Sequence, residues 1–306
     1  MEQSRTREEG SARRIGPYRL VTRLDPPGPF GPAVPCRRFV ARTRDGGRTV
    51  LLNAPLPGAD SARFAVEADA ARRLLGAWVA PVTDLAPPGE TPWYATPYVP
   101  ALPLPVALAV HGGPLPEATV RAVGTALAEA LAGAHAQGLT HAGVSPAAVL
   151  LTADGPRLSC FGAVRAAGAD GEARTGLPGL EPGALAPEQA SGGRPRPPGD
   201  VYALGAVLAF AATGHTVPER DELPVALRPL VSSCLARDPA DRPTAADLVA
   251  ALAPPTPHRT VLNSAGSLLT PGWLPGRVVA ALARQSSELL AAELPADTAP
   301  DTPPRT

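Results

Sequence analysis

The sequence predicts an α+β protein with a small β-rich N-terminal part and a larger helical C-terminal part. Several short segments before residue 100 alternate apolar and polar side chains, as half-buried strands do, and Tyr18–Leu24 shows this pattern most clearly. Farther along, Pro116–Gln137 carries apolar side chains at helical spacing, and Val201–Ala212 is an almost unbroken apolar run. A hydrophobic fraction of 44% is ordinary for a chain of 306 residues that buries a core.

The composition excludes several classes of partner. The formal net charge is +0, from 28 basic and 28 acidic residues, so no long-range field draws the chain to nucleic acid or a membrane surface. Cys36, Cys160 and Cys234 lie far apart without metal-ligand spacing, which fits a reduced cytosolic chain. The N-terminus has no signal-peptide core, and the longest apolar run is shorter than the roughly 20 residues that span a bilayer. We therefore expect a cytoplasmic protein with no membrane span.

Three strands open the N-terminal part. They are predicted at Tyr18–Leu24, Cys36–Thr43 and Thr49–Asn53, and the last two are joined by a turn at residues 45–47. The connection Asp25–Pro35 contains five prolines, each of which lacks an N–H and fixes φ. We expect it to be a stiff surface loop that offers few backbone donors.

A helix and two further strands complete this part. The helix is predicted at Ala62–Leu75, and the strands are predicted at Val79–Asp84 and Trp93–Tyr98. The helix face expected to be buried holds Phe64, Ala71, Leu74 and Leu75.

The C-terminal part is organised around the stretch Leu139–Gly162. The preceding helix, Pro116–Gln137, begins at a proline and is followed by Gly138, both regular boundary signals. After a loop, a short hairpin is predicted, with a strand at Val149–Leu151 and a turn at residues 154–155.

Five motifs follow one another from this stretch onward. They are His141-Ala-Gly-Val-Ser-Pro-Ala-Ala148, Cys160-Phe-Gly162, Ala186-Pro-Glu188, Asp200-Val-Tyr-Ala-Leu-Gly205 and Asp238-Pro-Ala-Asp-Arg242-Pro-Thr244. Their order and spacing resemble the Hanks-type serine/threonine protein kinases of bacteria, whose loop reads H-R-D-L-x-x-x-N and whose hairpin ends in D-F-G. The resemblance covers about residues 15–252. It implies a bilobal protein-kinase-like fold, with a small β-rich N-lobe over about 15–98 and a larger helical C-lobe over about 99–252.

The residues that match the family are its architectural ones. On this resemblance, His141 and Phe161 belong to an internal stack of side chains, and Asp200 anchors that stack to a buried helix. Glu188 and Arg242 are expected to form a buried ion pair inside the C-lobe. Losing one partner of such a pair costs several kcal/mol, so the presence of both indicates a folded lobe.

The residues that depart from the family are those that touch phosphate, metal or the substrate hydroxyl. Asn53 stands at the phosphate-binding lysine, Gly143 at the catalytic base, Ser145 at the catalytic-loop lysine, and Ala148 and Cys160 at the two metal ligands. The sequence has no lysine at all. Glu67 stands where the family's lysine-pairing glutamate does, and it is either solvated or paired with Asn53 or a nearby arginine.

The nucleotide site is therefore expected to be degenerate, with no retained catalytic residue and no metal. At the hinge between the lobes, Thr96 matches the gatekeeper, and Tyr98 and Val99 provide the backbone that faces an adenine. Because only backbone is needed there, weak binding of ATP or an adenine-like ligand stays possible.

The resemblance implies a catalytically inactive pseudokinase, acting as a scaffold or allosteric regulator of a protein partner such as an active kinase or another signalling protein. The alternative is a noncanonical ATP-binding kinase, or another transferase, that uses relocated residues. A small-molecule sensor that uses the old nucleotide cleft is a third possibility.

Segments outside the kinase-like domain are expected at both ends. Residues 1–14 and 294–306 are predicted to be disordered, residues 253–271 to form a Pro-rich linker, and residues 272–293 to form an amphipathic helix. This helix either packs back on the C-lobe or binds a partner. Its apolar face is expected to hold Val278, Val279, Leu282, Leu289 and Leu290.

Overall fold

The computed structural model describes residues 14–25, 33–219, 221–252, 269 and 272–291. The predicted disordered ends lie outside the described residues, except Arg14, which belongs to the first strand. Most of the predicted Pro-rich linker and the centre of the proline-containing loop at 25–35 also lie outside them.

A six-stranded antiparallel sheet forms the N-terminal lobe, in the order β1-β2-β3-β4-β6-β5. Its strands are β1 (Arg14–Ile15), β2 (Tyr18–Arg23), β3 (Arg37–Arg42), β4 (Thr49–Ala54), β5 (Asp84–Leu85) and β6 (Tyr94–Pro97). Tyr18, Phe39, Leu52 and Trp93 meet in a buried apolar cluster, because alternate residues of each strand point to the same face.

The helix of this lobe, α1 (Ser61–Ala71), begins at Asp60, whose carboxylate accepts from the backbone N–H groups of Ala62 and Arg63. The helix ends four residues before the predicted end, so Leu75 is 68% exposed and its predicted burial is wrong.

The predicted strand Val79–Asp84 is also wrong, because only Asp84 belongs to a strand. Pro81 cannot donate to a ladder, and Val79 bridges instead to Leu158 of the C-terminal lobe. The backbone N–H of Ala80 donates to the carbonyl of Leu158 at 3.0 Å, so this connection joins the two lobes.

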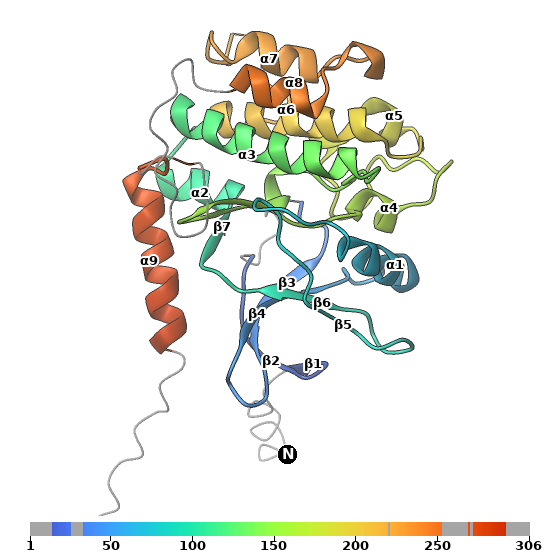
Figure 1. Cartoon of the computed structure of the whole chain (residues 1–306), viewed down its shortest axis with the longest axis vertical. Helices are drawn as coiled ribbons and strands as arrows, with labels where there is room; N and C mark the ends of the chain where they lie inside the picture. The colour runs from blue at the N-terminus through green and yellow to red at the C-terminus, as the bar shows by residue number, and fades with distance from the viewer. Residues whose placement is uncertain (1–13, 26–32, 220, 253–268, 270–271, 292–306) are drawn as a thin grey trace, which may run out of the picture.

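The C-terminal lobe consists of helices and a three-stranded sheet in the order β7-β8-β9, which lies on the side of the lobe facing the N-terminal lobe (Figure 1). The strands are β7 (Ala101–Pro103), β8 (Val149–Thr152) and β9 (Gly155–Leu158). The helices are α2 (Leu104–His111), α3 (Glu117–Ala136), α4 (Ala163–Ala167), α5 (Pro187–Ala190), α6 (Pro197–Thr213), α7 (Arg228–Cys234) and α8 (Ala245–Leu252). Short 3₁₀ turns lie at Pro146–Ala148, Pro182–Ala184 and Pro239–Asp241.

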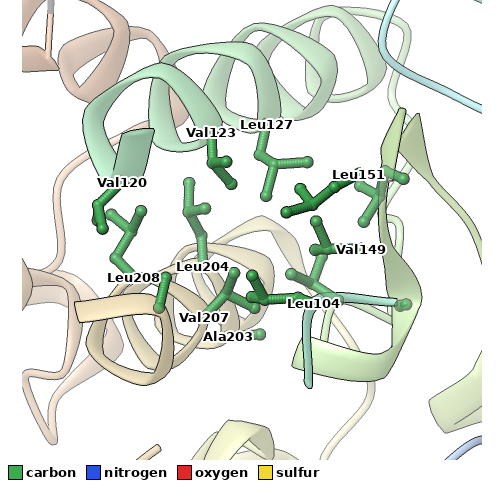
Figure 2. Close-up of a cluster of buried hydrophobic side chains, with 14 of the residues drawn as sticks. Leu104, Val120, Val123, Leu127, Val149, Leu151, Ala203, Leu204, Val207 and Leu208 are labelled. Carbon is green, nitrogen blue, oxygen red and sulfur yellow. The ribbon is translucent and has the colours of Figure 1, made fainter. Parts of the chain in front are cut away.

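The core of this lobe lies between α3, α6 and β8. Figure 2 shows Val123 and Leu127 of α3 facing Leu204 and Leu208 of α6, with Val149 of β8 beside them. Helix α6 is buried along nearly its whole length, which its lack of a polar face predicts. The two lobes with this strand and helix content confirm the predicted α+β, protein-kinase-like fold.

A last helix, α9 (Gly276–Ala291), begins beside α2 of the C-terminal lobe, on which it packs, and in the view of Figure 1 extends down to the level of the N-terminal sheet. Val278 and Leu282 are buried against the lobe, whereas Val279 is 49% and Leu290 61% exposed, so only part of the predicted apolar face is correct. The side-chain amide of Gln285 accepts from the N–H of Ala101 at 2.8 Å and donates to its carbonyl at 3.1 Å. Of the two alternatives for this helix, the structure has the packed one.

Within the described residues, no helix combines the length and apolar character needed to cross a membrane.

Candidate functional site

The loop 139–148 is held by a carboxylate at the first turn of α6. Asp200, 1% exposed, accepts from the backbone N–H groups of His141 and Ala142, both at 2.7 Å, and lies 2.9 Å from Nε2 of His135. A carboxylate at a helix N-terminus is stabilised by the helix dipole, so the position of Asp200 at the start of α6 favours its charged form. Ala142 adopts a φ of 50°, a conformation that this anchor imposes on a residue with a side chain.

His141 and Phe161 form the stack that the sequence indicated. Their rings lie 5.5 Å apart, edge to face. Both ring nitrogens of His141 are buried without a hydrogen-bond partner, and burial lowers its pKa to about 4. His141 is therefore neutral near pH 7 and acts here as an apolar wall rather than as an acid or base.

Gly143, at the position of the family's catalytic base, lies against the backbone of the hairpin end. A Cβ at this position would stand 1.9 Å from the carbonyl oxygen of Cys160 and 3.2 Å from the N of Ala163. The space that a carboxylate would need is filled by main chain, so no side chain can be placed here without moving the backbone.

Asn53 and Glu67 face different neighbours. The amide nitrogen of Asn53 donates to the carbonyl of Leu51 at 3.2 Å, within its own strand. Glu67 pairs with Arg165, at 2.7 Å from Nη2 and 2.8 Å from Nε. Of the alternatives for Glu67, the nearby arginine is correct. Because Arg165 follows the Cys-Phe-Gly motif, the pair ties α1 to α4.

The two positions of the family's metal ligands offer no side-chain oxygen. Ala148 is fully buried, and its carbonyl accepts from the N–H and the hydroxyl of Ser159 at 3.0 and 2.7 Å. Cys160 has a buried thiol, and Mg²⁺ takes oxygen ligands. Ser145 caps the 3₁₀ turn by accepting from the N–H of Ala148 at 3.3 Å. In the part of the chain that the structure describes, no group of three or more His, Cys, Asp or Glu side chains could hold a metal. The residues present do not fit Mg²⁺.

A buried cation that the sequence analysis missed lies beside Asn53, the position of the missing lysine. Arg38 of β3 is 1% exposed and lies directly across from Asn53 in the β3–β4 ladder. Its guanidinium pairs with Asp25 through two hydrogen bonds and donates to the carbonyl of Ala147 at 2.7 Å. The side chain thus links the N-terminal lobe to the loop 139–148. The signal was the pair Arg37-Arg38, since neighbouring strand residues point to opposite faces and one must point inward.

The cavities between the two lobes differ in volume. Three cavities of about 10 to 20 Å³, which border Gly143, Asn53 and Glu67 respectively, each hold little more than one water molecule. At the hinge, a cavity of about 140 Å³ is bordered by Leu51, Thr96, Tyr98, Val99 and Leu150, among others. Engineered cavities of about 150 Å³ take a benzene-sized ligand, so this one has room for a small ring.

The charged pair of the C-terminal lobe lies outside this cleft. Arg242 and Glu188 form two parallel hydrogen bonds of 2.7 and 2.9 Å. Arg242 also donates to the carbonyls of Ala236, Pro198 and Arg237, and its guanidinium lies over the ring of Tyr202.

Comparison with known proteins finds similar chains among bacterial serine/threonine protein kinases. Over 294 residues the chain is 37% identical to the probable serine/threonine-protein kinase PkwA of Thermomonospora curvata, in a match that covers 87% of this chain and 38% of that protein. Over 289 residues it is 35% identical to the serine/threonine-protein kinase AfsK of Streptomyces coelicolor, covering 87% and 35%. AfsK of Streptomyces griseus is 34% identical over 298 residues, covering 89% and 35%.

The chain is a homologue of bacterial serine/threonine protein kinases. No protein-family model matches it. The chain spans between 35% and 38% of the length of these three kinases.

The structure tests which of the predicted site residues lie together. The structure brings together His141, Phe161 and Asp200, and separately Glu188 and Arg242. It does not bring Glu67 to Asn53. Arg38 and Arg165, which the sequence analysis did not single out, form ion pairs with Asp25 and Glu67.

Proposed function

We propose that this kinase homologue is catalytically inactive and acts by binding a protein partner, as a scaffold or an allosteric regulator of a kinase or another signalling protein. The observations that carry the proposal are the buried link from Arg38 to the carbonyl of Ala147 and the contact at Gly143, where a Cβ would stand 1.9 Å from the carbonyl oxygen of Cys160.

The chemistry of phosphoryl transfer supports the proposal. Transfer depends on positioning and charge stabilisation by metal ions and a lysine, with a carboxylate that accepts the hydroxyl proton. Asn53, Ala148 and Cys160 supply none of these charges, and Gly143 supplies no acceptor. General base catalysis alone is worth about 10²–10⁴-fold, before the loss of both metal ligands is counted.

Arg38 could stand in for the missing lysine only by giving up its present contacts. It would leave the carboxylate of Asp25 and the carbonyl of Ala147 without their partner, inside a buried site. Breaking a buried pair in this way costs several kcal/mol, which a weakly held nucleotide does not return.

The test is an autophosphorylation and generic-substrate assay with labelled ATP, in Mg²⁺ and in Mn²⁺. The expected result is no incorporation above a no-protein blank. A variant pair sharpens the assay, with Arg38→Met in the cleft and Arg121→Ala on the surface of α3. Incorporation that Arg38→Met abolishes and Arg121→Ala retains would overturn the proposal.

The second candidate is a noncanonical ATP-using kinase or other transferase, or a sensor that uses the same cleft. The hinge cavity of about 140 Å³ favours at most the binding of a small ring there. A thermal-shift series with adenine, ADP and ATP, each with and without Mg²⁺, separates the candidates. Stabilisation by adenine alone indicates a hinge ligand, whereas saturable stabilisation that requires Mg²⁺ and the triphosphate supports an enzyme.

A further inference from the structure

Two of the three cysteines lie together across the cleft. Cys36 precedes β3 in the N-terminal lobe, and Cys160 follows β9 in the C-terminal lobe. Each is 4% exposed, each has a free thiol, and both border the same cavity of about 20 Å³ beside Glu67 and Tyr94. The proposed function uses neither thiol.

The surroundings make the two thiols unequal. Cys36 donates to the side-chain oxygen of Asn53 at 3.6 Å, and the hydroxyl of Ser159 lies 3.5 Å from the sulfur of Cys160. Interaction with the Cys36 thiol, together with the nearby Arg38 cation, lowers the pKa of Cys160 despite its burial. The same interaction, together with burial, raises the pKa of Cys36. Because the Asn53 side-chain oxygen can only accept, the proton stays on Cys36, and Cys160 is the thiol of the pair that ionises more readily.

Other ionisable groups around the pair do not reverse this assignment. The carboxylate of Asp25 acts against the thiolate but is paired with Arg38, whose guanidinium lies between the two lobes. Tyr94, also buried beside the pair, has its pKa raised by burial and stays neutral.

We propose that Cys160 and Cys36 form a peroxide-reactive modification site, in which Cys160 is the attacking thiolate, Cys36 is the resolving thiol and the product is a disulfide between the lobes. The inference concerns the chain's own thiols and holds whether or not the cleft has any kinase activity.

The reaction balances with hydrogen peroxide as the oxidant. The sulfur of Cys160 attacks one peroxide oxygen, the O–O bond breaks, and hydroxide leaves and takes a proton from solvent to become water. The sulfur of Cys36 then attacks the resulting sulfenic acid, its proton leaves with the departing hydroxyl as a second water, and the S–S bond forms. Two electrons pass from the two sulfurs to the peroxide.

The third cysteine, Cys234, serves as an internal control for a thiol that should not react. Cys234 lies in α7, fully buried against α6, and burial raises its pKa to about 12. A thiol in such surroundings carries almost no thiolate near pH 7 and is inert toward peroxide.

The experiment treats the full chain with hydrogen peroxide, blocks free thiols after denaturation and identifies the products by mass spectrometry. The expected result is the loss of two thiols, a peptide pair joining residues 36 and 160, a free Cys234, and full reversal by dithiothreitol. Cys160 should react at least about tenfold faster than Cys234 in the folded chain.

Single substitutions separate the two roles. Cys36→Ser should leave a sulfenic acid on Cys160 that dimedone traps, and Cys160→Ser should leave Cys36 unreacted. Cys234→Ser should behave as the wild type. Three free thiols in the treated wild type, a disulfide to Cys234, or trapping of Cys36 in Cys160→Ser would overturn the proposal.

Discussion

The pair Arg242–Glu188 allows a stability prediction whose size follows from the geometry. The side chain of Arg242 is fully buried and donates five hydrogen bonds, two of them to the carboxylate of Glu188. The side chain of Glu188 is 32% exposed. Removing one partner of a buried pair costs about 3–5 kcal/mol. We therefore expect Arg242→Ala to lower the free energy of unfolding by about 4 kcal/mol, because three backbone carbonyls also lose their donor.

Substitution of Glu188, the other partner of the pair, should lower the free energy of unfolding by less. In Glu188→Gln the guanidinium keeps its three backbone carbonyls, and water reaches the partner position, so we expect a loss of about 1–2 kcal/mol. For a domain of this size each kcal/mol lowers the melting temperature by about 2–4 °C. The expected shifts are then about 8–16 °C for Arg242→Ala and about 2–8 °C for Glu188→Gln.

The assay is urea unfolding followed by circular dichroism, with melting curves alongside. The matched control is Arg121→Ala, which removes a helix-surface pair with Glu117 whose side chains are 33% and 41% exposed. Such pairs are worth at most about 0.5 kcal/mol. If Arg242→Ala melts within 2 °C of the control, the reasoning about the buried donor set is refuted.

Three further predictions concern the cleft. Burial lowers the pKa of His141 to about 4 from an ordinary 6.5. Between these two pH values the unfolded chain therefore binds more protons than the folded chain. The stability that this histidine contributes above pH 6.5 is lost as the pH falls toward 4. Urea unfolding at pH 7 and pH 5 should show a loss about 2 kcal/mol smaller in His141→Leu than in the wild type, and equal losses would contradict this. Gln285→Ala removes both hydrogen bonds to Ala101, so hydrogen exchange at that hinge amide should speed up about tenfold, and unchanged exchange would show that α9 does not restrain the hinge. Arg38→Met should lower the free energy of unfolding by about 3 kcal/mol, whereas Arg37→Met, on the opposite strand face, should cost less than about 1 kcal/mol, and similar losses for both would argue against the buried link.

The architecture was predictable because short motifs fix where the chain must turn and what it must bury. The resemblance gave Asp200 an anchoring role, and in the structure its carboxylate accepts from the backbone N–H groups of His141 and Ala142. Glu188 and Arg242 are 54 positions apart, and only the resemblance to a family joined them, since spacing alone carries no such signal. The same resemblance identified which residues had lost their chemistry.

The contacts made by side chains between the two lobes were less predictable, because they depend on how the lobes pack against each other. Cys36 and Cys160 are remote in sequence, and their meeting follows from how the two lobes close. Arg38 lies in a segment with an ordinary strand pattern, and its inward direction is set by the register with Asn53. The prediction of a strand at Val79–Asp84 was wrong for a similar reason, because Val79 pairs with Leu158 of the C-terminal lobe.

Restoring the lost kinase residues provides the last test, and the structure makes its outcome specific. The variant combines Asn53→Lys, Gly143→Asp, Ala148→Asn and Cys160→Asp. A Cβ at Gly143 would stand 1.9 Å from the carbonyl oxygen of Cys160, and this obstacle is backbone, which cannot swing aside as a side chain can. Glu67 is also held by Arg165 at 2.7 Å, so a new lysine at position 53 would have to compete for it.

We expect the fourfold variant to be destabilised and to transfer no phosphate, because positioning errors of even about 1 Å can cost about 10²-fold. The matched variant keeps Gly143 and carries the other three substitutions. If the steric argument is right, Gly143→Ala alone should destabilise the chain, and the threefold variant should be more stable than the fourfold one. Autophosphorylation and urea unfolding are measured on all of them. A fourfold variant that folds as stably as the wild type and phosphorylates itself would contradict the steric argument. It would show that the loop 139–148 can move away from the hairpin, so that the arrangement described here is only one of the conformations that the protein adopts.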